Sequence, residues 1–259
     1  MQTCFIIRRT RSESLHITPY EEVKLSAKWN EDEPLTWYAS TGLHTQEKDH
    51  ALLKIYTQID RGVDRWIQDA RYVPRLLISA AVFLVVYFFF SLAIRDPIPM
   101  IDELILATGS AIATAVFIGR RDKKSDMAMK RRLDLKQNAS RADFEILEGL
   151  SSYEDYLDTC LALDTLDLAD RLAKTKKAQL PELTVPQEHR GEWQAEFYSR
   201  LLRHVEVTNR RLFERYQKVM SSRRTDVGDE ALAARLVKSA LRNEIDLPLL
   251  ALMVAISKQ

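Results

Sequence analysis

Glycine and cysteine are scarce in this sequence. Its 259 residues include seven glycines and two cysteines, Cys4 and Cys160. So few glycines argue against an extensive β-structure with tight turns, and the composition favours helices. The two cysteines are isolated, which indicates no metal site, and both are expected in a reducing compartment where a disulfide does not form.

The sequence motifs that accompany catalysis are also missing. There is no P-loop, no Gly-x-Gly-x-x-Gly, no Gly-x-Ser-x-Gly and no Cys-x-x-Cys, and the five histidines include no pair at zinc-binding helical spacing. We therefore expect no catalytic residue, no cofactor and no metal, and we do not expect an enzyme. The formal net charge of +1 argues against a general nucleic-acid binder.

Charge is absent from the first of two apolar runs. Residues 76–94 carry no charge over about 19 positions, and a helix of that length covers a hydrocarbon core of about 30 Å. The second run reaches the required length when it is counted from about residue 100 to residue 119. Pro97 and Pro99 separate the two runs and force a turn. The segment 75–121 is therefore predicted to be a transmembrane helical hairpin.

Two acidic residues, Asp102 and Glu103, stand near the start of the second run. We expect them at the headgroup level, in the first turn of the helix, where the helix dipole favours negative charge. The alternative is that these intramembrane acids bind a cation or a proton, or meet a partner.

Small residues recur every four positions along the second run. They are Ala107, Ala111, Ala115 and Gly119. A stripe of this kind lets helix backbones approach closely, so we predict that it packs on the first span. Packing against a second copy of the chain is the alternative.

Basic residues cluster at the outer ends of the hairpin. Arg120, Arg121, Lys123 and Lys124 follow the second span and form a candidate membrane-surface basic cluster, while the loop between the spans offers Arg95 alone. The positive-inside rule then predicts that both termini are cytoplasmic. We expect no cleavable signal peptide, so the first span would act as an uncleaved anchor.

The rest of the chain is predicted to form two cytoplasmic regions. Residues 1–74 contain a possible short strand at 2–8 and an amphipathic helix from Thr45 with an apolar stripe: Leu52, Ile55, Ile59, Val63, Trp66, Ala70 and Val73. Residues 122–259 are predicted to form a helical domain with coiled-coil-like character, with helices over 122–143, 152–177, 193–219, 230–243 and 247–256. The last of these is almost wholly apolar, and we expect it to be buried in the bundle; the alternatives are docking on a partner and insertion into the membrane face.

Taken together, these patterns predict an all-α membrane protein that combines a two-helix hairpin with a cytoplasmic helical bundle. The expected function is that of a membrane-anchored scaffold, whose partners are the lipid bilayer and another protein or a second copy of the chain. The alternative is an oligomeric channel or transporter subunit that uses the polar and small residues of the second span.

Overall fold

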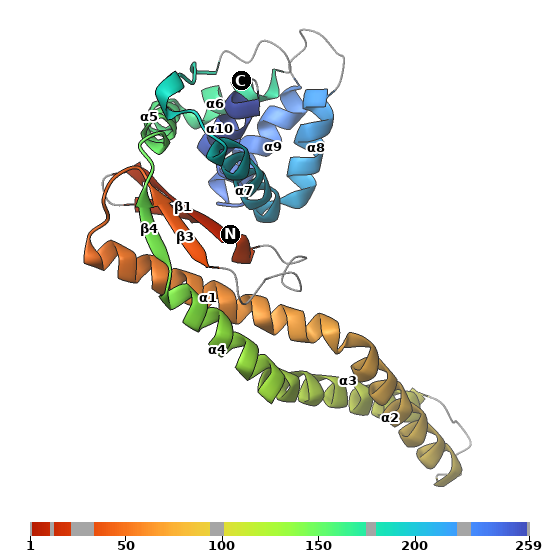
Figure 1. Cartoon of the computed structure of the whole chain (residues 1–259). Helices are drawn as coiled ribbons and strands as arrows, with labels where there is room; N and C mark the ends of the chain where they lie inside the picture. The colour runs from red at the N-terminus through yellow and green to blue at the C-terminus, as the bar shows by residue number, and fades with distance from the viewer. Residues whose placement is uncertain are drawn as a thin grey trace. The chain divides into compact units, whose positions relative to one another are not determined.

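The computed structural model describes residues 2–10, 13–21, 34–93, 101–174, 180–221 and 229–257. It is mostly helical with one small sheet (Figure 1). The chain divides into two compact units. The sheet unit comprises the described residues of Met1–Glu22, Asp32–Ile55 and Ala139–Gln259, and the hairpin unit contains Tyr56–Asn138.

The sheet has four strands in the order β2-β1-β3-β4. Their bounds are β1 Gln2–Thr10, β2 Glu13–Ile17, β3 Leu35–Ala39 and β4 Asp143–Ile146. The pair β1–β2 is antiparallel, whereas β1–β3 and β3–β4 are parallel. Parallel neighbours need a crossover connection. Between β3 and β4 that connection contains both membrane-length helices, so the predicted hairpin is an insertion between two adjacent strands.

Strand β1 is buried because both faces of the sheet are covered. Its apolar run Cys4–Ile7 is almost fully buried, which is typical of a strand without a solvent-facing side. On one face Phe5 meets Phe197 edge to face, with 5.1 Å between ring centroids. On the other face Trp37 stacks on Phe144, and Lys48 lies over the Phe144 ring.

The helices of the sheet unit pack around the last of them. Their bounds are α5 Leu150–Leu161, α6 Thr165–Ala173, α7 Trp193–Thr208, α8 Arg210–Ser221, α9 Glu230–Leu241 and α10 Leu247–Ser257, with 3-10 turns at η1 Pro19–Glu21 and η3 Gln187–His189. Residues Leu249–Ala255 of α10 are all buried. Of the alternatives for this apolar segment, the structure therefore supports burial in the bundle.

Four helices build the hairpin unit, and two of them extend beyond it. Their bounds are α1 Thr45–Ala70, α2 Tyr72–Ala93, α3 Ile101–Lys123 and α4 Asp126–Ser140. The unit boundaries fall inside α1 and near the end of α4. Helices α2 and α3 are both long and apolar enough to cross a membrane. They pack against each other and are called the hairpin below.

Helix α1 buries a stripe that differs slightly from the predicted one. Ile55, Ile59 and Val63 are fully buried as expected, but the stripe continues at Ile67, while Ala70 and Val73 are exposed. The helix has 3.6 residues per turn, so steps of four keep Ile59, Val63 and Ile67 on one side.

The all-α class requires a correction, because a mixed sheet accompanies the helices. The strand predicted at 2–8 is present and extends to Thr10. The helix predicted over 122–143 is instead the end of α3, a break at residues 124–125, and α4. Residues Asp143–Ile146 then pair with β3 as a strand.

Two long predicted helices are each divided. The 152–177 helix is interrupted after Leu161 and resumes at Thr165. The 193–219 helix breaks at Asn209, whose backbone is not helical (φ −147°, ψ 84°) and whose Oδ1 accepts a hydrogen bond from the Leu212 N–H at 3.1 Å. Asparagine is a favoured N-cap, so Asn209 starts α8 as a new helix. The turn with Pro97 and Pro99 lies outside the described residues, and the domain boundaries at 74/75 and 121/122 stay predictions.

Candidate functional site

One face of α3 forms the interface between the two helices of the hairpin. Its less exposed positions recur at steps of three and four: Glu103, Ala107, Ser110, Ala111, Thr114, Ala115, Ile118, Gly119 and Asp122. All four residues of the predicted small stripe therefore lie on this face, and Ala107 is fully buried. Small side chains here let the α2 and α3 backbones approach closely.

A buried carboxylate closes the hairpin at its base, the end where α2 begins and α3 ends. Asp122 is almost fully buried, and it accepts hydrogen bonds from two arginines that lie one turn apart on the chain. The Arg71 Nη1 atom lies 2.9 Å from Oδ1, and the Arg75 Nη2 atom lies 3.2 Å from Oδ2. Both carboxylate oxygens are thus occupied by charged donors, the arrangement that a buried charge requires.

Gly119 makes room for one of these arginines. A Cβ atom added at Gly119 would lie 3.3 Å from Nη1 and 3.4 Å from Cζ of Arg75. Those distances are tighter than ordinary van der Waals contact. The last member of the small stripe therefore accommodates a guanidinium rather than a helix backbone.

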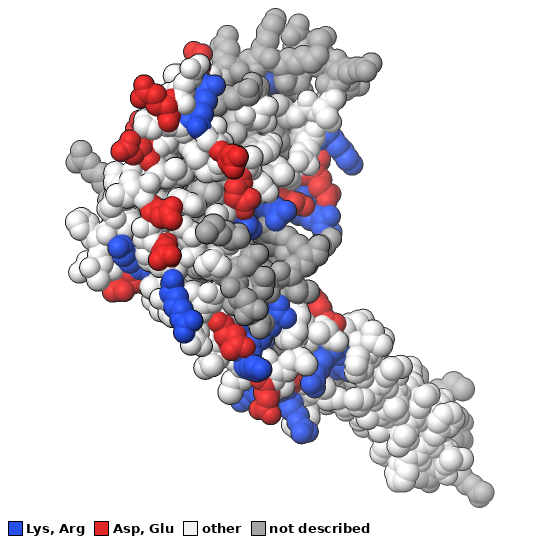
Figure 2. All heavy atoms as spheres, in the orientation of Figure 1, with Lys and Arg blue, Asp and Glu red and all other residues white. Residues whose placement is uncertain are grey.

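Acidic and basic side chains alternate where α1 meets the end of α3 and α4. Asp64 pairs with Lys123 at 2.9 Å and with Arg132, and Asp60 pairs with Lys136 at 2.8 Å. The Arg132 Nη1 atom also donates to the Lys123 carbonyl at 2.9 Å. We call this set the charge ladder. In Figure 2 blue and red side chains gather in the region of α1 and α4, whereas the described residues on the visible face of the hairpin farther along are white.

An aromatic contact adds to the charge ladder. The Arg131 guanidinium lies over the Trp66 ring, 4.1 Å from its centroid. Trp66 was predicted to belong to the apolar stripe of its helix. It is half-buried and makes a cation–π contact instead.

The predicted basic cluster separates into two parts. Lys123 pairs with Asp64, whereas Arg120, Arg121 and Lys124 are exposed and line a cavity of about 950 Å³. Arg71, in the turn between α1 and α2, contributes to the same cavity. We call this cavity the basal groove.

The two predicted intramembrane acids lie at the opposite end of α3. Asp102 is exposed, whereas Glu103 is 6% exposed and faces the helix interface. Among the residues described, no group forms a hydrogen bond with the Glu103 Oε2 atom. The two neighbouring carboxylates therefore occupy different surroundings.

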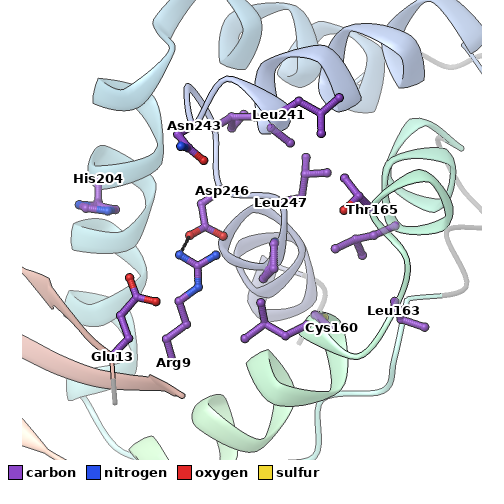
Figure 3. Close-up of a pocket in the computed structure, with 15 residues that line it drawn as sticks. Arg9, Glu13, Cys160, Leu163, Thr165, His204, Leu241, Asn243, Asp246 and Leu247 are labelled. Carbon is purple, nitrogen blue, oxygen red and sulfur yellow. Dashed lines mark ion pairs between the residues drawn. The ribbon is translucent and has the colours of Figure 1, made fainter. Parts of the chain in front are cut away.

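The sheet unit contains a separate cavity of about 550 Å³ (Figure 3). An ion pair between Arg9 of β1 and Asp246 lies at its wall, with 2.8 Å between Nη1 and Oδ2. Burial raises the pKa of Asp246, while Arg9 and the Leu249 N–H oppose that rise. Figure 3 shows His204 and Glu13 near this pair. The two charges satisfy each other, as expected of a structural contact.

Cys160 also lines this second cavity. Burial raises the pKa of the Cys160 thiol, which disfavours the nucleophilic thiolate. No group of three or more His, Cys, Asp or Glu side chains among the described residues is placed to hold a metal ion.

Sequence reasoning missed the acidic residues that organise the base of the hairpin. Asp60, Asp64 and Asp122 were not among the predicted site residues. Asp122 itself carried a usable signal. It follows an apolar span and lies three residues after Gly119, on the same face of the helix. A carboxylate on that face is costly unless it is paired, so it predicts a basic partner on the neighbouring span.

Comparisons with protein-family models, with curated proteins and with solved structures found no match for this chain.

Proposed function

We propose that this protein is a membrane-anchored helical scaffold. The observation that carries the proposal is the outward exposure of the hairpin's apolar side chains. Each of these helices contains an apolar stretch of 18 residues. Within that stretch, 6% of the residues of α2 and 11% of the residues of α3 are buried inside the protein. In a core helix of a soluble protein, most residues of such a stretch are buried by the rest of the chain. The helices α2 and α3 therefore need an apolar environment from outside the chain.

The exposed side chains are large. On the outer surfaces of α2 and α3 they are Leu76, Leu77, Ile78, Leu84, Val85, Phe88, Phe89, Leu92, Leu104, Ile105, Leu106, Ile112, Val116 and Phe117. Each side chain of this size gains about 1.5–3 kcal/mol when it is fully removed from water. A lipid bilayer supplies that burial for both helices, and their lengths match its hydrocarbon core.

The proposed topology places the base of the hairpin at the cytoplasmic surface. The basal groove and the charge ladder concentrate Lys and Arg at that end. Under the positive-inside rule both termini then lie in the cytoplasm. The arginine-paired Asp122 supports this placement, because an ion-paired carboxylate is tolerated near the interface much better than in the hydrocarbon.

The scaffold role is proposed over a catalytic one because Asp246 and Asp122, one in each cavity, are held in ion pairs with arginines. Recruitment of a protein partner, or self-association, is proposed through the cytoplasmic helices. Helix α4 supports this idea, since Met127, Met129 and Leu133 are more than half exposed on it. Exposed large apolar residues outside a membrane are typical of interaction surfaces.

The channel alternative has less support from the polar residues of α3. Of the hydroxyl residues Thr108, Ser110 and Thr114, Thr108 is exposed, whereas the other two lie on the face that packs against α2. The Thr114 hydroxyl donates to the Ser110 carbonyl within the helix at 2.8 Å. A pathway between copies would need such groups on an outward face. Ion flux in liposomes that contain the purified chain tests this alternative directly.

Alkaline extraction of membranes tests the anchoring. The unchanged chain is expected to stay with the lipid, and a variant with Val85→Lys and Phe88→Lys on the outer surface of α2 is expected to lose insertion, because charges are costly in the bilayer. Leu53→Lys on α1 is the matched control, since Leu53 is equally exposed but lies outside the hairpin. Release of the unchanged chain by alkali would contradict the anchor.

A further inference from the structure

The basal groove is lined by charged side chains at one end and by apolar side chains at the other, and the two parts follow each other along the axis of α3. Its charged part holds Arg120, Arg121 and Lys124, with Arg71 opposite, and its apolar part holds side chains one turn closer to the middle of the hairpin. From Phe117 to Arg121 the helix rises by about 6 Å. The groove therefore changes from apolar to cationic over about one helical turn.

Cationic charge dominates the polar part of the groove. Four basic side chains and the carboxylates of Asp122 and Asp126 line it, which leaves a surplus of two positive charges. Asp122 already accepts from Arg71 and Arg75, so its charge is offset within the protein. Asp126, at the start of α4, is the one carboxylate of the lining whose charge would repel an incoming anion.

Three of the basic groups are available for an external anion. Arg120, Arg121 and Lys124 are exposed, and within the described part of the chain none of them forms an ion pair. Lys123, in contrast, pairs with Asp64. Guanidinium groups bind phosphate with two parallel hydrogen bonds, and an ammonium adds a point charge.

The apolar part of the groove is formed by Ile78 of α2 and by Phe117 and Ile118 of α3. Ile78 and Phe117 are 47% and 68% exposed. A free phosphate ion would gain nothing from these side chains. A ligand with a phosphate at one end and hydrocarbon at the other matches both parts.

We propose that the basal groove binds an anionic phospholipid of the cytoplasmic leaflet. The phosphate and headgroup contact Arg120, Arg121 and Lys124, and the start of an acyl chain lies against Ile78 and Phe117. The volume of about 950 Å³ accommodates a headgroup with its glycerol backbone. This inference rests on the proposed membrane anchoring, and it adds that the anchor selects its lipid.

Native mass spectrometry of the full chain in a neutral detergent tests the proposal. The protein is titrated with phosphatidylglycerol and, separately, with phosphatidylcholine. We expect phosphatidylglycerol to bind about tenfold more tightly or better, because each basic side chain near the surface favours an anionic lipid. Equal binding of the two lipids would overturn the proposal.

A charge-matched pair of variants locates the site. Arg120→Gln, Arg121→Gln and Lys124→Gln together are expected to remove the preference. The control variant carries Arg61→Gln, Arg65→Gln and Lys130→Gln, three exposed basic residues of α1 and α4 that do not line the groove, and it loses the same charge. If both variants lose the preference equally, general surface charge explains the binding and the groove is not its site.

Two further arms separate the possible outcomes. Inorganic phosphate and glycerophosphoglycerol, which has the headgroup without acyl chains, are expected not to displace the bound lipid at tenfold excess. Displacement by either would show a phosphate site instead of a lipid site. Alkaline extraction of the same variants reports anchoring independently, so retained insertion without lipid preference refutes this inference and leaves the anchor intact.

Discussion

Arg75 of α2 and Asp122 of α3 form a largely buried ion pair at the base of the hairpin, with 3.2 Å between Nη2 and Oδ2. Their side chains are 16% and 5% exposed. The pair joins the start of the first apolar helix to the end of the second. Because Arg71 occupies the other carboxylate oxygen, one acidic residue links the end of α1, α2 and α3.

Replacement of Asp122 is therefore expected to weaken the hairpin. Asp122→Ala leaves two arginines near each other without their common partner, and breaking a buried pair in this way costs about 3 kcal/mol. Thermal unfolding of the purified chain in detergent is expected to shift to lower temperature. Asp126→Asn is the control, because Asp126 is exposed, and an equal shift for both variants would contradict the role of the pair.

Side-chain size at Gly119 is expected to matter more than at Gly109. At Gly119 an added Cβ would crowd the Arg75 guanidinium, whereas at Gly109 no atom lies within 4 Å of the added Cβ. Replacement by Ala gains up to about 1 kcal/mol of helix propensity at either site. Gly119→Ala is thus expected to be near neutral, since crowding offsets that gain.

Leucine at the same two positions gives the sharper comparison. Gly119→Leu is expected to displace Arg75 and to lower the unfolding temperature as Asp122→Ala does, whereas Gly109→Leu is expected to be tolerated on an outward surface. Similar stability of the two leucine variants in detergent would show that Arg75 moves away without loss.

The charge ladder is expected to contribute modestly and to depend on salt. Asp60 and Asp64 are 46% and 33% exposed, so each ion pair is worth about 1 kcal/mol or less. Asp60→Asn with Asp64→Asn is expected to speed hydrogen exchange in α1 and α4 at low salt. The difference should shrink at 0.5 M salt, which is roughly where screening is strong.

Asp69→Asn is the matched control for the ladder, because Asp69 is an exposed acidic residue of the same helix. Faster exchange in that control as well would indicate a loss of general helix stability instead of specific pairs.

Acidification is expected to destabilise the sheet unit through His16. Burial, then the charges of Lys54 and His50, lower the pKa of His16 to about 4. In the unfolded chain the pKa of His16 is near 6.5. Between about pH 4 and pH 6.5 the unfolded chain therefore binds more protons than the folded one. Stability is therefore fully present above about pH 6.5 and falls as the pH is lowered toward 4, by roughly 2–3 kcal/mol.

Hydrogen exchange of strands β1 to β3 between pH 4 and 7, corrected for intrinsic rates, measures this dependence. His16→Asn keeps an acceptor for Lys54 Nζ, which lies 3.3 Å from Nδ1, and removes the titration. This variant is expected to flatten the pH dependence, and His44→Asn, at an exposed position, is expected to leave it unchanged. An unaltered profile in His16→Asn would assign the loss of stability to other groups.

The hairpin helices were predictable because their signal is local. A run of 19 uncharged residues and a repeat of small residues are properties of one segment, and so is the short strand predicted at 2–8, which is present as β1. The start of the helix predicted at residue 230 is local too, since the Asp229 side chain caps it by accepting from the Leu232 N–H at 3.0 Å.

The sheet was harder to predict because its pairing is not local. Strand β4 is four residues long, its Phe144 contacts Trp37 from a distant part of the sequence, and Ile146 is exposed, so the segment resembles the end of a charged helix. The base of the hairpin was missed for the same reason. Arg71 and Asp122 lie 51 residues apart, so the carboxylate of Asp122 calls for a basic partner but nothing local shows that Arg71 is that partner.

Labelling of single cysteines in intact cells tests the membrane-crossing hairpin most directly. Ile101 and Lys124 are exposed at opposite ends of α3, and the natural Cys4 and Cys160 are buried, so the unchanged chain gives the background. With an impermeant maleimide we expect Ile101→Cys to be labelled from outside, and Lys124→Cys only after permeabilisation. Labelling of neither site, or of both, before permeabilisation would contradict a hairpin that crosses the membrane with both termini in the cytoplasm.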